Sequence, residues 1–304
     1  MRQEELAACL IKTSAAGKTA ESPAADSTEK LRTIGQMRVL DMHAHLSVLS
    51  GEYAGKLLTA AANRGEPLER EQLGKKELDF RKKAGIATCL SAGTPQEWAC
   101  LKEFADRKEL LFSFGIHPWY ADRYEPREYL ELFGRCDVVG EIGMDNVWCD
   151  VSLKRQRKNL EEQLQIASDL GKPIVLHTKG QEWEIWEMLK GFSYPILIHW
   201  YSGNEDVFEK FLDLDCYFTL GPDLALENPM YAVMLREVGA DRLFVETDGL
   251  SAVAWAKQVE FLDFPLLPPV LEKNMALAAE QKNTTAEALH RQMTENLRRF
   301  LVSV

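Results

Sequence analysis

The sequence lacks closely paired cysteines and long apolar runs. Its six cysteines are Cys9, Cys89, Cys100, Cys136, Cys149 and Cys216, and no two of them form a CxxC pair. This scatter argues against a zinc knuckle or a dense disulfide scaffold and favours reduced thiols. No apolar stretch approaches the ~20 residues needed to span a bilayer, and the N-terminus has no signal-peptide pattern. We therefore expect a soluble, cytoplasmic protein.

The chain also lacks an excess of positive charge. It has 36 basic and 47 acidic residues, which gives a net charge of −11. This charge would repel a polyanion at long range and argues against a protein that coats nucleic acid electrostatically. A nuclease is not excluded, because bound divalent ions supply positive charge locally.

Apolar residues are scarce at the N-terminus. Residues 13–36 are mostly small and polar, which is typical of a linker or a disordered arm. We therefore divide the chain into an N-terminal extension, residues 1–36, and a folded domain, residues 37–304. Because Met37 opens the first convincing strand, the extension is either disordered or a mis-assigned translation start.

From Met37 onward, short apolar runs alternate with amphipathic helical stretches, a pattern that favours parallel strands with helical crossovers. An open doubly wound sheet would normally carry a GxGxxG turn after its first strand. Ser47 to Gly51 contain no such turn. The sequence therefore predicts an α/β fold, a (β/α)8 TIM barrel. The eight expected strands are Val39–Leu46, Ala87–Gly93, Leu111–His117, Val138–Met144, Pro173–Thr178, Pro195–Ser202, Cys216–Gly221 and Leu243–Gly249.

Polar residues with metal-ligand chemistry lie in or at the ends of several of these strands. His43 and His45 are separated by one residue, so in a strand both imidazoles project from the same face. Singly, each residue has an ordinary explanation, such as a hydrogen-bonded histidine or a salt-bridged carboxylate. Together they predict a metal centre at the carboxyl end of the barrel. The candidate ligands are His43, His45, Glu141, His177, His199 and Asp248.

Six mixed imidazole and carboxylate ligands exceed what one tetrahedral ion needs, so we expect two divalent ions, Zn, Mn or Mg. A carboxylate such as Glu141 can bridge the pair. Two ions about 4 Å apart would stabilise both the attacking and the leaving oxygen of a phosphoryl displacement.

The chain closely resembles the TatD family of metal-dependent deoxyribonucleases from Met37 almost to its end. The resemblance rests on Leu40–Leu46, Gly115–Pro118, Gly140–Asp145, Gln156, Gln163, Leu164, Pro173–His177, His199–Gly203, Glu246–Asp248 and Thr294–Asn296. It implies a barrel that hydrolyses phosphodiesters, often as a 3′-to-5′ exonuclease on single-stranded DNA. It also implies that His43, His45 and Asp248 serve one ion, that His177 and His199 serve the other, and that Glu141 lies between them. Asp248 would be the general base.

The residues around these motifs depart from the family pattern. Trp200 and Tyr201 replace the usual Cys-Phe, and Gly249-Leu250-Ser251 replaces Ala-Pro-Tyr. The expected Arg- and Asn-containing loop gives way to Ala252–Lys257. These departures leave the metal motifs intact and make the substrate less certain than the hydrolytic chemistry.

Several side chains beside the motifs are candidates for substrate binding. His117 either contacts the scissile phosphate or supports a ligand. Lys179 either contacts phosphate or is a solvated lysine, and Ser202 is a candidate substrate contact. Trp119, Trp148 and Trp200 either stack on bases, or pack in the core or line a pocket.

The leading hypothesis is a DNase acting on DNA ends or oligonucleotides. One alternative is an amidohydrolase-type enzyme for a small ester, lactone or amide, and the other is a non-catalytic, metal-stabilised binding subunit.

Overall fold

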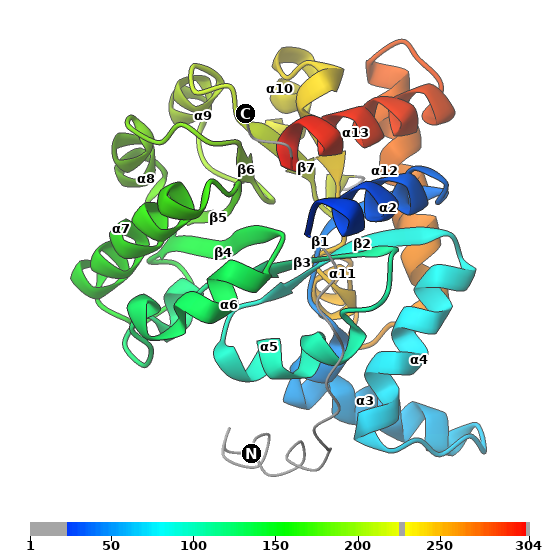
Figure 1. Ribbon diagram of the computed structural model, residues 1–304. Coiled ribbons are helices and arrows are strands. Elements are labelled where there is room, and N and C mark those ends of the chain that lie inside the picture. Colours follow the sequence, from blue (N-terminus) through cyan, green and yellow to red (C-terminus); the bar gives the residue numbers. More distant parts are fainter. Residues whose placement is uncertain (1–22, 225–228, 302–304) are drawn as a thin grey trace.

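The computed structural model describes residues 23–224 and 229–301 of the protein, and these contain a closed parallel barrel (Figure 1). Strands pair in chain order, and β1 closes the barrel against β8 through the pair Asp41 and Val245. The strands are β1 Val39–Ala44, β2 Ile86–Ala92, β3 Leu110–Phe114, β4 Val138–Asp145, β5 Ile174–Lys179, β6 Ile196–Ile198, β7 Tyr217–Leu220 and β8 Leu243–Val245. The predicted (β/α)8 fold and all eight strands are confirmed.

Helices connect the strands and surround the barrel, so the strands are buried on both faces. The α-helices are α2 Pro23–Gly35, α3 Gly51–Asn63, α4 Arg70–Lys83, α5 Pro95–Leu101, α6 Leu130–Arg135, α7 Leu153–Leu170, α8 Glu182–Leu189, α9 Glu205–Leu212, α10 Pro229–Glu237, α11 Leu250–Ala256, α12 Leu267–Gln281 and α13 Ala286–Leu301. Short 3-10 helices are η1 Ser47–Leu49, η2 Lys102–Phe104, η3 Pro118–Tyr120, η4 Pro126–Tyr129, η6 Ala240–Arg242 and η7 Phe264–Leu266.

Helix α7 shows how an outer helix positions the ends of the strands. Its bounds agree with the helical spacing of its leucines, and Gly171 ends it with φ of 64°, a backbone conformation that glycine adopts without strain. The helix buries two glutamines. Gln163 accepts a hydrogen bond from the backbone N–H of Ile116 at 2.7 Å, and Gln156 accepts one from Asp145 at 2.7 Å. Both bonds fix backbone at the carboxyl ends of β3 and β4.

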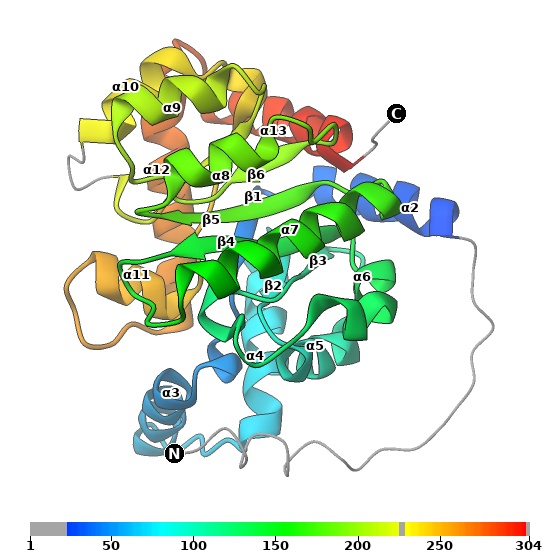
Figure 2. The ribbon, with the colours of Figure 1, turned by 90° about the vertical axis from the view of Figure 1, so that its left-hand side faces the viewer.

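Part of the predicted N-terminal extension is helical in the described residues. Residues 23–35 form α2, which lies at the opposite end of the barrel from α11 (Figure 2). The side chain of Ile34 is fully buried, and Lys30 forms an ion pair with Asp137 at 3.1 Å. One buried isoleucine among polar neighbours is too weak a pattern to predict this helix. Residues 1–22 lie outside the described residues.

Within the described ranges, no helix is both long enough and apolar enough to cross a membrane.

Candidate metal centre

The carboxyl ends of the strands bring all six predicted ligands together. His43 lies in β1, Glu141 in β4 and His177 in β5. His45, His199 and Asp248 lie in the loops directly after β1, β6 and β8. His43, Glu141, His177 and His199 are buried, while His45 and Asp248 are partly exposed. Solvent therefore reaches the cluster at His45 and Asp248, while the other four ligands are enclosed.

Glu141 lies at the middle of the cluster, and its two carboxylate oxygens face different histidines. Oε2 lies 3.3 Å from Nε2 of His43 and 3.2 Å from Nε2 of His45. Oε1 lies 2.7 Å from Nδ1 of His177 and 2.7 Å from Nε2 of His199. One carboxylate thus divides the four predicted histidine ligands into two pairs.

Asp248 lies on the Oε2 side of Glu141. Its Oδ1 is 3.5 Å from Nε2 of His43 and 3.7 Å from Nε2 of His45. Its backbone has φ of 54°, which is uncommon outside glycine, and its N–H donates to the carbonyl of His43 at 3.0 Å. The next residue, Gly249, has φ of 88°, and a Cβ there would lie 2.4 Å from the carbonyl oxygen of His45. The turn therefore needs glycine so that Asp248 can approach β1.

A buried polar network joins α4, β1 and the segment after β8. Arg81 of α4 donates to Asp41 of β1 at 2.7 Å and to Glu77 at 3.2 Å. Asp41 in turn accepts hydrogen bonds from the backbone N–H and the hydroxyl of Thr247, at 2.8 and 2.6 Å. The position of Asp248, one residue further, therefore depends on this network.

Electrostatics in the cluster lower the pKa of Glu141 and raise the pKa values of His45 and His199. Burial alone would raise the pKa of Glu141, but His199 and His117 hold that pKa well below its ordinary value. Burial alone would lower the pKa of His199, yet Glu141 and Glu246 raise it well above its ordinary value. The same competition raises the pKa of His45 to about 9, through Glu141 and Asp248. Such opposed shifts in one opening are typical of a functional site.

Two buried acids beside the cluster were not among the predicted site residues. Asp145 at the end of β4 lies 3.0 Å from Nε2 of His177, and Glu246 lies 3.6 Å from Nδ1 of His199. Both acids belong to the motifs quoted above. Glu246 lies two residues before Asp248 and Asp145 lies four residues after Glu141, and this closeness in the chain to a candidate ligand is the signal that could have identified them. Carboxylates that contact the far ring nitrogen of a ligand histidine orient the ring and increase its basicity.

The donor set fits divalent metal ions. Nε2 of His43, which faces Glu141 and Asp248, is buried and has no hydrogen-bond partner within the described residues. An unpaired buried polar atom is costly, and metal coordination would satisfy this nitrogen. Three groups of three side chains have ligand atoms within 4.8 Å of one another: His43, His45, Glu141; His43, His199, Asp248; and His117, Glu141, His177. Imidazole and carboxylate donors suit Zn²⁺, Mn²⁺ and related ions.

The predicted substrate contacts lie around this cluster. His117 is buried with Nε2 3.3 Å from Oε1 of Glu141, so the structure brings it inside the cluster. Lys179 at the end of β5 donates to the hydroxyl of Ser202 at 2.5 Å and lies 6.0 Å from the ring centre of Trp200. The loop that departs from the family pattern forms a helix, α11.

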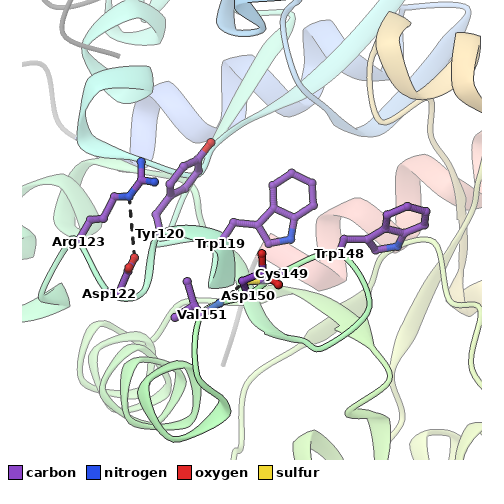
Figure 3. A pocket seen from close by; sticks show the side chains of 8 residues that line it. All are labelled: Trp119, Tyr120, Asp122, Arg123, Trp148, Cys149, Asp150 and Val151. Carbon is purple, nitrogen blue, oxygen red and sulfur yellow. Dashed lines mark hydrogen bonds and ion pairs between the residues drawn. The ribbon is translucent and has the colours of Figure 1, made fainter. Parts of the chain in front are cut away.

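A pocket of about 410 Å³ lies beside the cluster, in the loops after β3 and β4 (Figure 3). Trp119, Tyr120 and Trp148 supply its aromatic surface, and Asp122 and Arg123 supply polar groups. Trp119 donates from Nε1 to Oδ2 of Asp145 at 2.7 Å.

Comparison with known proteins places this arrangement in a family. The sequence matches the family described as TatD related DNase over residues 40–302. It is 30% identical over 162 residues to the human "3'-5' RNA nuclease TATDN2", a match that covers 49% of this chain and only 21% of the human protein. It is 28% identical over 196 residues to the "Uncharacterized metal-dependent hydrolase YcfH" of Escherichia coli (strain K12), covering 60% of this chain and 73% of that protein.

Solved structures agree on the fold. The TatD homolog YJJV from Escherichia coli k12 superposes with a TM-score of 0.67 at 20% identity and covers 87% of this chain and 98% of its own. A TatD family hydrolase from Entamoeba histolytica gives a TM-score of 0.67 at 13% identity, with 88% and 99% covered. Because the family match spans most of the chain, the protein belongs to the TatD family of metal-dependent hydrolases.

Proposed function

We propose that this protein is a divalent-metal-dependent phosphodiesterase that removes nucleotides from the 3′ ends of single-stranded DNA. The observation that carries the proposal is the division of the histidines by Glu141. Its Oε2 faces His43 and His45, and its Oε1 faces His177 and His199. A carboxylate between two sets of nitrogen donors is the arrangement required to bridge two ions in a phosphoryl-transfer site.

In this proposal each ion has its own ligands. His43, His45 and Asp248 would hold one ion, His177 and His199 would hold the other, and Glu141 would serve both. The ions would supply Lewis acidity and lower the pKa of water. His117 lies close enough to Glu141 to act either as a further ligand or as a phosphate contact.

Asp248 is the candidate general base. Of the six ligands it combines a carboxylate with access to solvent, since its side chain is 19% exposed while Glu141 is 3% exposed. Its strained backbone holds the carboxylate toward the opening. A base must lie within hydrogen-bond reach of the water from which it takes a proton, and a carboxylate on the rim of the cluster meets that requirement.

Lys179 and Ser202 complete the proposed phosphate site. Burial lowers the pKa of Lys179, and the neighbouring Asp223 opposes that shift. The ammonium and the hydroxyl are already hydrogen-bonded to each other, so a phosphate oxygen would meet two donors at once. Such a local site offsets the unfavourable net charge of −11.

The test is an oligonucleotide assay with Mg²⁺, Mn²⁺ or Zn²⁺, on matched single-stranded DNA and RNA. We expect progressive shortening from the 3′ end that chelator abolishes, and at least 100-fold loss of rate in His43→Ala and Asp248→Asn. Asp206→Asn in α9, an acid outside the cluster, is the matched control and should retain activity. RNA-only cleavage would overturn the choice of DNA, and shortening that persists in both site variants would overturn the site.

A panel of small esters, lactones and amides tests the competing hydrolase, because turnover of one of these without cleavage of any oligonucleotide would support it. Elemental analysis tests the hypothesis of a non-catalytic binding subunit. We expect two metal ions per chain after reconstitution, whereas a protein that binds none would contradict the proposed centre.

A further inference from the structure

Four tryptophans line the mouth of the barrel above the metal centre. Trp119, Trp148, Trp200 and Trp255 follow strands β3, β4, β6 and β8 in the chain. The rings of Trp148 and Trp255 meet edge to face at 5.9 Å, and those of Trp200 and Trp255 meet at 5.7 Å. We call these four residues the tryptophan arc.

Much of the arc faces solvent. Trp119, Trp148 and Trp255 are 43%, 55% and 60% exposed. Exposed tryptophans are costly for solubility, and several of them together mark a binding surface. The core-packing alternative for Trp119 and Trp148 therefore does not hold.

Two members of the arc line the pocket of about 410 Å³. In Figure 3, Arg123 lies at one edge of this pocket and Trp148 at the other, with Trp119 between them. A volume of a few hundred Å³ is the size of a site for a small planar ligand. The indole faces give such a ligand two surfaces on which to stack.

The pocket is tied to the metal centre through Trp119. The indole N–H donates to Oδ2 of Asp145, and the same oxygen lies 3.0 Å from Nε2 of His177. The ring of Trp119 also meets the ring of His117 edge to face at 5.0 Å. Its one polar group is thus satisfied, so the part of Trp119 left for a ligand is its aromatic surface.

Charge around the pocket argues against binding by phosphate contacts alone. Arg123 lies 3.9 Å from Asp122, and Asp150 also lines the pocket. With a net charge of −11, the protein does not attract a polyanion at long range. Stacking on aromatic rings is a source of affinity that needs no positive charge.

We propose that Trp119 and Trp148 bind an unpaired nucleobase of the nucleotide next to the scissile bond, so that the enzyme selects strands whose terminal bases are unstacked. The inference rests on the proposed phosphodiesterase function. A duplex end hides the faces of its bases, whereas a single-stranded end presents them. Stacking contacts the face of a base and makes no hydrogen bonds to its edge. The pocket therefore accepts every base and does not distinguish DNA from RNA.

Trp148 is the residue to change, because Trp119 also supports Asp145. The binding assay uses an Asp248→Asn background, which prevents cleavage. In this background Trp148→Ala should weaken the metal-dependent binding of a single-stranded oligonucleotide about tenfold, a typical value for one stacked base. Trp148→Phe keeps a stacking ring and should restore most of the affinity. Trp183→Ala is the matched control, since Trp183 is equally exposed but packs on Trp186 in α8.

A second experiment removes the nucleobase from the oligonucleotide and leaves the indole of Trp148 in place. An oligonucleotide whose last two residues are abasic should bind the Trp148-containing protein about tenfold more weakly than the normal strand. The Trp148→Ala protein should bind the two strands equally. DNA and RNA versions of each strand show whether the sugar contributes.

The outcomes distinguish a failure of the proposed phosphodiesterase function from a failure of the stacking pocket. If the unmodified protein cleaves no oligonucleotide with any of the metals, both the proposed function and the nucleobase proposed as the ligand of the pocket are contradicted. If it cleaves single strands but binds normal and abasic ends equally, or if Trp148→Ala binds as tightly as Trp183→Ala, only the stacking pocket is wrong. Equal affinity for a blunt duplex and a single strand would also overturn the inference.

Discussion

The carboxylate of Glu246 lies 3.6 Å from Nδ1 of His199, and both side chains are buried in the described part of the chain. Neither carboxylate oxygen has a hydrogen-bond partner there. Burial raises the pKa of Glu246, and His199 opposes that rise. The acid therefore sits where it can favour a proton on Nδ1 and leave Nε2 of His199 free to face Glu141 and a metal ion.

Replacing this acid should weaken metal binding without unfolding the protein. We expect Glu246→Gln to lower metal affinity about 10- to 100-fold, the usual cost of losing a carboxylate that orients a ligand histidine. Calorimetric titration with Mn²⁺ measures the change, and circular dichroism monitors the fold. Glu295→Gln on the exposed face of α13 is the control. Unchanged affinity in Glu246→Gln would show that the acid does not orient His199.

Metal affinity should depend on pH through His45. In the metal-free protein, burial would lower the pKa of His45, but Glu141 and Asp248 raise it from 6.5 to about 9. A protonated imidazole cannot bind metal, so an ion must displace the proton. Affinity for Mn²⁺ should therefore increase from pH 6.5 to about 9 and then level off. Titrations at several pH values measure this, and a flat profile would contradict it.

The same shift has the opposite effect on the stability of the metal-free protein. Because the folded-state pKa of His45 lies above the unfolded value, its contribution is full below pH 6.5 and is lost as pH rises through about 9. Thermal unfolding in chelator should show a falling Tm over this range. Saturating metal should remove most of that fall, because metal-bound His45 no longer carries the proton.

The turn at Gly249 should not tolerate a side chain. We expect Gly249→Ala to destabilise the protein by about 1–3 kcal/mol, because a Cβ would meet the carbonyl of His45 in a backbone conformation that costs non-glycine residues energy. Activity should fall with it, since Asp248 would move. Gly55→Ala in the exposed interior of α3 has open space and should stabilise by about 0.5–1 kcal/mol. Urea unfolding compares the two, and equal effects would contradict the close approach.

Arg81 should be important for stability although it is remote from the substrate. Removing one partner of a buried ion pair leaves an uncompensated charge, so Arg81→Met should cost about 3–5 kcal/mol. Arg298→Met breaks an exposed pair with Glu295 and should cost less than about 1 kcal/mol. Chemical denaturation of both variants measures the difference. A small effect at Arg81 would mean that Asp41 keeps its hydrogen bonds to Thr247 without it.

The sequence predicted the barrel and the cluster because both depend on local order along the chain. Apolar runs identify the strands, and parallel strands put the residues at their ends, such as His177 and His199, at one edge. The partners of these residues depend on three-dimensional distance. Arg81 pairs with Asp41, and Asp145 contacts Nε2 of His177. These contacts join segments that are far apart in the sequence, and the periodicity of apolar residues does not reveal which of them pack together.

Helix α2 and the tryptophan arc were harder to predict for a different reason. The helix is held by two apolar side chains, Leu31 and Ile34, and by an ion pair of Lys30 with Asp137, which leave almost no periodic pattern. Trp255 belongs to a segment with no family motif, so only the structure shows that it meets Trp148 and Trp200.

The bond from the N–H of Asp248 to the carbonyl of His43 joins the last strand to the first. During synthesis the ribosome releases β1 long before β8, so these two segments meet only after the whole barrel has been made. Such a distant contact is slow to form. A nascent or C-terminally shortened chain would therefore hold most of the histidines without the acid that the proposed reaction needs. In that proposal hydrolytic activity would appear only once the ring of strands has closed.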